Sequence, residues 1–300
     1  MSLEGGTFYN IVMLTLSIIA LVFNSLDFLV NFSNKLYKQS LYNCLKLYSN
    51  VCAIILSIRN IVVSFANLCI LNDDWFFTSK DVCLGRAITD NIIVTLYQVA
   101  FVFEIIVFGL SVVHPVFFMK HIDNKTSKIC IGFFIIFISI FIGCMMLIGR
   151  GNLPQYLGFC VIYNNWTLNF QEAHSSFTLA ALILVIIIYI RTARQIGRMS
   201  SEEKFKKNLC SFMCWSMFFF MIFGILPNTL LVVSFFMNFD CNFRNVCLDT
   251  FYLTICISLI VPFPFALWKN KLIRKHFLEL PFVPKVIYRT SITKTSNIIT

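Results

Sequence analysis

Long apolar runs separated by short polar stretches recur along the whole chain. A helix rises 1.5 Å per residue, so about 20 apolar residues are needed to cross a bilayer core about 30 Å thick. Seven runs approach that length, and the fifth reaches it only with its flanking residues. They cover about residues 9–32, 45–71, 88–113, 129–148, 177–190, 207–236 and 246–268. The pattern predicts an all-α membrane protein, a seven-transmembrane helix bundle that forms one domain over residues 1–300.

A short basic stretch follows the seventh run. Residues 269–277 combine four cations with the apolar side chains of Leu272, Ile273 and Phe277. This spacing is typical of a short amphipathic helix that lies in the inner membrane interface. A basic stop sequence fits the same residues equally well. A short cytoplasmic tail, residues 278–300, is expected to follow.

The basic residues are distributed unevenly between the two sides of the expected bundle. Lys and Arg mark cytoplasmic loops, and 19 of the 24 fall on the loops of one side. The other five are Arg59, Lys80, Arg86, Arg150 and Arg244. This asymmetry predicts a multi-pass protein of the plasma membrane with its N-terminus outside and its C-terminus in the cytoplasm.

Composition excludes several other classes of protein. Hydrophobic residues make up 58% of the chain and charged residues 13%, against about 45–50% and about 25% in soluble domains. The net charge of +10 lies on membrane-flanking loops, which favours anionic lipid headgroups over nucleic acid as its partner. The sequence contains no CxxC, HExxH or His/Cys cluster, and its four His have no nucleophile or carboxylate at useful spacing. We therefore expect no metal, no cofactor, no catalytic residue and no enzyme activity.

Two cysteine pairs fall on the outer side in this topology. Cys83 begins the third segment, and Cys160 lies in the long loop between the fourth and fifth. Because both face an oxidising compartment, a disulfide between them is expected; two buried free thiols are the alternative. Cys241 and Cys247, placed in the third outer loop, either close a second, smaller loop or remain reduced.

Several spacings resemble the rhodopsin-like G-protein-coupled receptors over the whole membrane body. That family has a cysteine at the top of its third helix, an Asp-Arg-Tyr triplet 24 to 26 residues later, and often His-Pro seven residues after the arginine. Here Cys83 is followed in the same register by Val107-Phe108-Gly109 and then by His114-Pro115. The register is kept, whereas the arginine of the triplet is replaced by Phe108.

Two further motifs of that family have counterparts here. Its first-helix asparagine matches Asn24, and its seventh-helix Asn-Pro-x-x-Tyr is altered to the run from Val261 to Phe265. The altered motifs, the 34 Phe and the short N-terminus are most similar to the serpentine chemoreceptors of nematodes. Pro227 and Pro262 are expected to kink the sixth and seventh helices.

The resemblance implies a chemosensory receptor that detects an extracellular small molecule and signals through a heterotrimeric G protein. The residues expected to face the G protein are Phe108, His114, Pro115, Arg191, Arg194, Arg198 and Lys204. Two other classes remain open. The chain could be a small membrane transporter or channel, or a seven-helix membrane protein that does not signal.

Ionisable groups inside apolar segments are costly, so they are candidates for a site. Arg59 and Asp90 stand in the outer halves of adjacent segments. Three alternatives stay open for Asp90: a pair with Arg59, contact with a ligand ammonium as in the amine receptors of the resembling family, or a solvated position. Further candidates for the ligand pocket are Tyr97, Gln98, Asn228 and Thr229, each of which could instead make an interhelical hydrogen bond.

Two more carboxylates, Asp27 and Glu104, lie deeper in the apolar segments. With Asn24, Ser49 and Asn50 they could form a polar network. Such a network would act either as a sodium-like or proton-linked switch or as a static packing contact.

The topology predicts a single N-glycan. Asn31, Asn124 and Asn165 all have the acceptor pattern, but only Asn165 lies in an expected outer loop. A glycosidase-sensitive band on a gel should therefore disappear in Asn165→Gln.

In intact cells an N-terminal tag should be stained, and a C-terminal tag only after permeabilisation. Staining of the C-terminal tag on intact cells would contradict the topology.

Overall fold

The computed structural model describes the chain in several stretches. They are residues 6–72, 78–145, 156–157, 168–198, 226–237 and 241–281, with positions 215, 218–219 and 222–223. Within these residues the protein is helical except for two short strands, β1 (Thr78–Ser79) and β2 (Tyr156–Leu157). The strands pair antiparallel, with Thr78 opposite Leu157.

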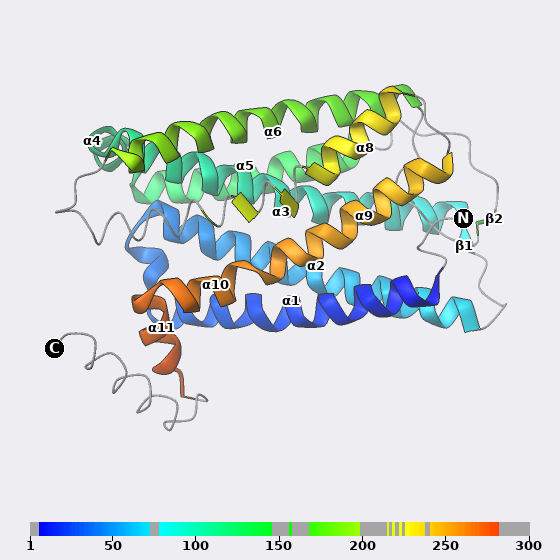
Figure 1. Cartoon of the computed structure of the whole chain (residues 1–300), viewed down its shortest axis with the longest axis horizontal. Coiled ribbons are helices and arrows are strands. Elements are labelled where there is room, and N and C mark those ends of the chain that lie inside the picture. Colours follow the sequence, from blue (N-terminus) through cyan, green and yellow to red (C-terminus); the bar gives the residue numbers. More distant parts are fainter. Residues whose placement is uncertain are drawn as a thin grey trace.

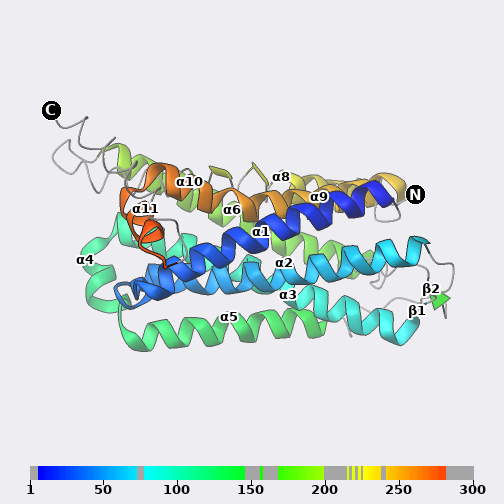
Figure 2. The ribbon, with the colours of Figure 1, turned by 90° about the horizontal axis from the view of Figure 1, so that it is seen from below.

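The helices lie side by side in an elongated bundle (Figure 1). In chain order they are α1 (Thr7–Ser33), α2 (Leu41–Asn72), α3 (Lys80–Val113), α4 (Pro115–Phe117), α5 (Lys125–Met145), α6 (Leu168–Gly197), α8 (Leu226–Phe236), α9 (Cys241–Ile260), α10 (Pro262–Lys269) and α11 (Lys271–Leu278). Two helical turns, η2 (Leu36–Lys38) and η3 (Phe118–Ile122), join neighbouring helices. The strands lie at one end of the bundle, the β1 end, and α11 lies at the other, the α11 end (Figures 1 and 2).

Five helices in the described stretches are long and apolar enough to cross a membrane. They are Thr7–Ser33, Leu41–Cys69, Ile88–Val113, Lys125–Met145 and Asp249–Trp268. This is compatible with a membrane-embedded protein, and it confirms five of the predicted segments to within a few residues at most ends. The predicted segment 177–190 falls inside the longer α6, so it does borrow from its flanks. Of the predicted segment 207–236, α8 covers the last 11 residues, and most of the rest lies outside the described part.

Two expectations about the outer loops are wrong. The long loop ends earlier than residue 176, because α6 begins at Leu168. Cys241 and Cys247 are not in a loop, because both lie in α9. Six residues of helix rise about 9 Å, whereas a disulfide needs Cα atoms within about 7 Å. Accordingly Cys247 is a buried free thiol, and the bridge between these two cysteines is excluded.

The expected bridge between Cys83 and Cys160 stays a prediction. Cys83 lies in the first turn of α3, but Cys160 and the glycosylation candidate Asn165 lie outside the described residues. Pro262 begins α10 directly after a break at Val261, which is where the kink was expected. Pro227 lies in α8 close to the start of its described part, and the residues just before it, 224–225, lie outside the described part, so the kink at Pro227 stays a prediction.

The predicted amphipathic helix forms as α11, two residues later than expected at its start. Its apolar side chains Ile273 and Phe277 pack with Val30 of α1 and Phe263 of α10. The Arg274 guanidinium donates a hydrogen bond of 2.8 Å to the carbonyl of Leu267, near the end of α10. The apolar face of α11 therefore packs largely on protein.

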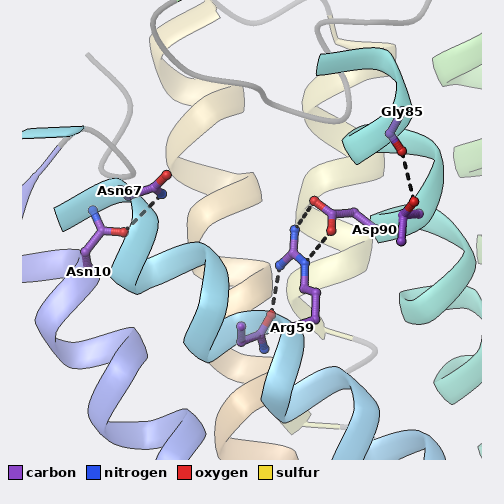
Figure 3. A network of polar contacts seen from close by, with 7 residues as sticks. Asn10, Arg59, Asn67, Gly85 and Asp90 are labelled. Atoms are coloured by element: carbon purple, nitrogen blue, oxygen red, sulfur yellow. Dashed lines mark hydrogen bonds and ion pairs between the residues drawn. The ribbon is translucent and has the colours of Figure 1, made fainter. Parts of the chain in front are cut away.

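Small and polar side chains are buried along α1 and along α2, and two polar contacts, Asn67 with Asn10 and Lys46 with Asp27, join these helices. Every third or fourth residue of α1 is buried, and nearly all of these residues are small or polar. Apolar residues such as Val30 on α1 and Leu45 and Leu56 on α2 are buried as well. The buried small and polar positions, with Met13, are Asn10, Ser17, Ala20, Asn24, Asp27 and Asn31 on α1, and Asn50, Ala53, Ser57, Asn60, Ser64 and Asn67 on α2. We call these positions the α1–α2 seam. The side-chain amide of Asn67 donates to Oδ1 of Asn10 at 3.2 Å, which sets an antiparallel register with Ser17 level with Asn60 (Figure 3).

The opposite face of α2 is apolar and exposed. Val51, Ile55, Ile58, Val62 and Phe65 lie on it. In lipid this distribution is favourable, because apolar side chains gain nothing from leaving hydrocarbon, whereas small polar residues allow close approach and hydrogen bonds between helices. The seam therefore explains why these two helices associate.

Helix α9 runs parallel to α1 and is joined to it at three heights. The contacts are Tyr9 Oη to the Asp249 carbonyl (3.2 Å), Ser17 Oγ with Cys256 Sγ (3.7 Å), and Asn24 Nδ2 to the Leu259 carbonyl (3.1 Å). Residue numbers rise together along both helices, which fixes their common direction. The Cys256 thiol also accepts a hydrogen bond from Asn60 of α2, so the three helices meet at one buried sulfur.

Loss of the Asn10–Asn67 contact should weaken the bundle by a small but measurable amount. Interhelical hydrogen bonds in membranes average about 0.6 kcal/mol and reach about 1.7 kcal/mol. A double-mutant cycle of Asn10→Leu and Asn67→Leu, read by reversible unfolding in lipid, should give a coupling energy in that range. Val62→Leu, on the exposed face of α2, is the matched control and should unfold like the wild type. A coupling energy of zero would show that the seam does not hold the two helices.

Candidate functional site

Arg59 of α2 and Asp90 of α3 form a bidentate ion pair inside the bundle. Nε donates to Oδ1 at 2.8 Å, and the second guanidinium nitrogen donates to Oδ2 at 2.5 Å (Figure 3). The two side chains are only 12% and 6% exposed. The planar guanidinium matches the two carboxylate oxygens, which is the strongest arrangement open to such a pair.

Other groups complete the surroundings of the Arg59 guanidinium. Its remaining terminal nitrogen donates to Oδ1 of Asn60 at 2.8 Å. The ring of Tyr252 on α9 lies 5.6 Å from the guanidinium carbon, within the range of a cation–π contact. The cation is thus held by α2, α3 and α9 together. Of the three alternatives for Asp90, the structure shows the internal pair and excludes the solvated position.

A second polar cluster lines a cavity of about 70 Å³ nearer the α11 end. Lys46 of α2 lies 3.4 Å from Asp27 of α1, and Asn31 donates to the same carboxylate at 2.9 Å. Tyr42 Oη donates to Oε1 of Glu104 on α3 at 3.1 Å. The cavity walls come from α1, α2, α3, α9 and α10. The shape of this inner cavity therefore depends on the relative positions of all five helices.

The inner cavity is polar but incompletely satisfied. Asn50 lines it, is only 6% exposed, and has no hydrogen-bond partner for its side-chain nitrogen. The volume exceeds the roughly 10–15 Å³ that one water requires, so a few waters fit and can serve this group. The cluster holds two carboxyl groups, Asp27 and Glu104, and one ammonium, Lys46, which pairs with Asp27. Among the residues described, no group of three or more His, Cys, Asp or Glu side chains could hold a metal ion.

The described candidates for the ligand pocket are found in more than one place: Arg59 and Asp90 pair with each other. Tyr97 is buried and lines the inner cavity, whereas Arg59 and Asp90 do not line it. Gln98 is half-buried on α3, and Thr229 is half-buried on α8. Asn228 lies in α8, but its side chain is outside the described part.

The residues expected to face the G protein divide into two groups. Phe108 is buried and packs on the Tyr42 ring at 5.8 Å between centroids, so it does not face the surface. The other expected residues that the structure describes are exposed at or near the α11 end: His114, Pro115, Arg191, Arg194 and Arg198. Lys204 lies outside the described residues.

Sequence reasoning missed Lys46 and Tyr42 as members of the inner cluster. Lys46 was counted only among the cytoplasmic basic residues, and Tyr42 precedes the predicted second run. In the structure α2 begins at Leu41, four residues before that run, so both residues lie in the helix. The signal was nonetheless present. Tyr42, Lys46, Ser49 and Ala53 recur at helical spacing and continue the polar face of α2 inward.

Removing one partner of the Arg59–Asp90 pair should destabilise the protein strongly. An uncompensated buried charge costs about 3–5 kcal/mol, so Arg59→Met and Asp90→Leu should each lose surface expression. The double variant should recover part of that loss. Normal surface expression of Asp90→Ala, with loss only of a response to cationic ligands, would instead make Asp90 the ligand's counter-ion.

Comparison with known proteins adds no family to these observations. The chain matches no known protein-family profile. A search of curated proteins found no sequence similar to it.

Proposed function

We propose that the chain is a seven-helix receptor of the plasma membrane that detects an extracellular small molecule and signals through a heterotrimeric G protein. The observation that carries the proposal is the inner cavity, whose walls come from five helices, near the end of the bundle that bears Arg191, Arg194 and Arg198. A change in helix packing would alter this cavity and the exposed cations together.

Two features support the number of helices and their direction. Because α1 and α9 run in the same direction, the chain must reverse its direction an even number of times from α1 to α9. Our proposal counts α6 and the segment that includes α8 as two further passes beside the five apolar helices. A bundle of seven passes has its first and last passes in the same direction, in agreement with α1 and α9. The basic asymmetry of the loops agrees with this arrangement.

The mechanism is a shift between two arrangements of the same helices. Ligand bound at the β1 end would stabilise one arrangement, to the extent that it binds that arrangement better. The Arg59–Asp90 pair joins α2 to α3 in the outer half, and the seam joins α2 to α1. Movement of α2 would thus reach Lys46 and Asp27 at the inner cavity. This route needs no arginine at Phe108.

The inner cavity also favours a second candidate, an ion-coupled transporter. Two carboxylates and a lysine in a cavity within the apolar part of a bundle are typical of ion pathways. Uptake of a solute into proteoliposomes that contain only this protein would support transport. A response that requires an added G protein would support the receptor.

Cells that express the protein with a panel of G-protein sensors should respond to at least one compound of a chemically diverse set. Replacing Arg191, Arg194 and Arg198 together by Ala should lower the potency or size of that response by about tenfold or more, the range of typical coupling energies. Surface expression should be unchanged, because all three side chains are exposed. Lys271→Ala, an exposed cation on α11, is the matched control. A full response from the triple variant would exclude this surface as the coupling site.

A further inference from the structure

An apolar groove opens on the outside of the bundle between α2 and α5. Its volume is about 490 Å³, and its walls include Tyr48, Val51 and Ile55 of α2 and Ile129, Gly132 and Ile136 of α5. Gly132 of α5 allows this helix to lie close to the Tyr48 ring of α2. A Cβ at this position would lie 3.0 Å from the Tyr48 ring, so the ring would have to shift by a few tenths of an ångström to admit a larger residue.

The length of the groove can be compared with the depth of one bilayer leaflet, which an acyl chain fills. It spans eight residues of each helix, a rise of about 10 Å. Half of a bilayer core is about 15 Å deep. Its first wall residue on α5, Ile129, stands only four residues from the start of that helix at the α11 end. A chain that enters there can run through most of the leaflet in contact with protein.

Basic residues surround that entrance. Lys125 is exposed and precedes Ile129 by one helical turn, so it continues the same face of α5 as Ile129, Gly132 and Ile136. Lys128 lies 3.6 Å from Asp123 and donates to the carbonyl of Lys38, which places η2 beside α5.

The charges at the entrance do not cancel. The Asp123 carboxylate forms an ion pair with Lys128 and accepts a hydrogen bond of 2.7 Å from the backbone N–H of Leu41. Lys38 and Lys125 are both exposed. This corner of the bundle therefore carries an excess of positive charge at the depth of lipid headgroups.

We propose that this groove is a binding site for an anionic glycerophospholipid, with one acyl chain between α2 and α5 and the phosphate at Lys38 and Lys125. The apolar walls match the chain, and the cations match the headgroup. A sterol would fill the groove but has no anionic group to meet the two lysines. The site is separate from the inner cavity and does not depend on signalling.

The test uses the full chain in nanodiscs that carry a trace of photoreactive lipid. Phosphatidylserine with a diazirine on its acyl chain should crosslink to peptides that contain Val51–Ile55 and Ile129–Ile136. The matching phosphatidylcholine probe should crosslink there several-fold less. Equal labelling by both probes, labelling confined to other helices, or displacement of phosphatidylserine by a sterol would each overturn the proposal.

Two pairs of variants separate the chain site from the headgroup site. Ile136→Trp should fill the groove and abolish the labelling, whereas Ile140→Trp, equally exposed on α5 but outside the groove, should not. Lys125→Gln should lower the preference for phosphatidylserine about fivefold, the factor that corresponds to about 1 kcal/mol per basic residue at an anionic surface. Lys271→Gln, also exposed at the α11 end, should leave that preference unchanged. A wild-type preference in Lys125→Gln would refute the headgroup site.

Discussion

The structure depends on burial of polar side chains between helices whose outer faces are apolar. Within hydrocarbon, apolar contact gives little reason for helices to associate, so hydrogen bonds and close packing must supply it. The α1–α2 seam supplies both, and α9 is attached to the same seam at Ser17, Asn24 and Cys256. These three helices form the part of the bundle on which the ion pair and the inner cavity are built.

The two polar sites place different demands on this scaffold. The Arg59–Asp90 pair is well satisfied, because two parallel hydrogen bonds, Asn60 and the Tyr252 ring surround the cation. The inner cluster has two carboxylates for one ammonium and an unpaired amide nitrogen at Asn50. A fully satisfied polar network makes the surrounding structure rigid, and a partly satisfied one does so less. The inner cavity is therefore better suited to change between two states.

Most of the helical segments could be predicted from the sequence, because the length of a spanning helix follows directly from the thickness of the bilayer. The seam was also readable, since Asn10, Ser17, Asn24 and Asn31 recur every seven residues. It was missed because hydropathy emphasises the apolar residues, which here face outward. The loop around Cys241 was misplaced for a related reason. Polar residues at the start of α9 lower its hydropathy, although their backbone is helical.

The candidate site could be predicted only at its charged residues, because a buried charge restricts the contacts that its side chain can make. Arg59 and Asp90 stand at similar depths on adjacent segments, and each is too costly to bury alone, so their pairing was one of three alternatives that the sequence offered. The structure shows that pair. Uncharged residues carry no such constraint. Tyr97 could have faced an outer pocket or the inner cavity at little difference in cost, and its place is decided by the rotation of α3 about its axis. That rotation is fixed by the Asp90 ion pair above and by Glu104 with Tyr42 below. The charged residues thus position the neutral ones.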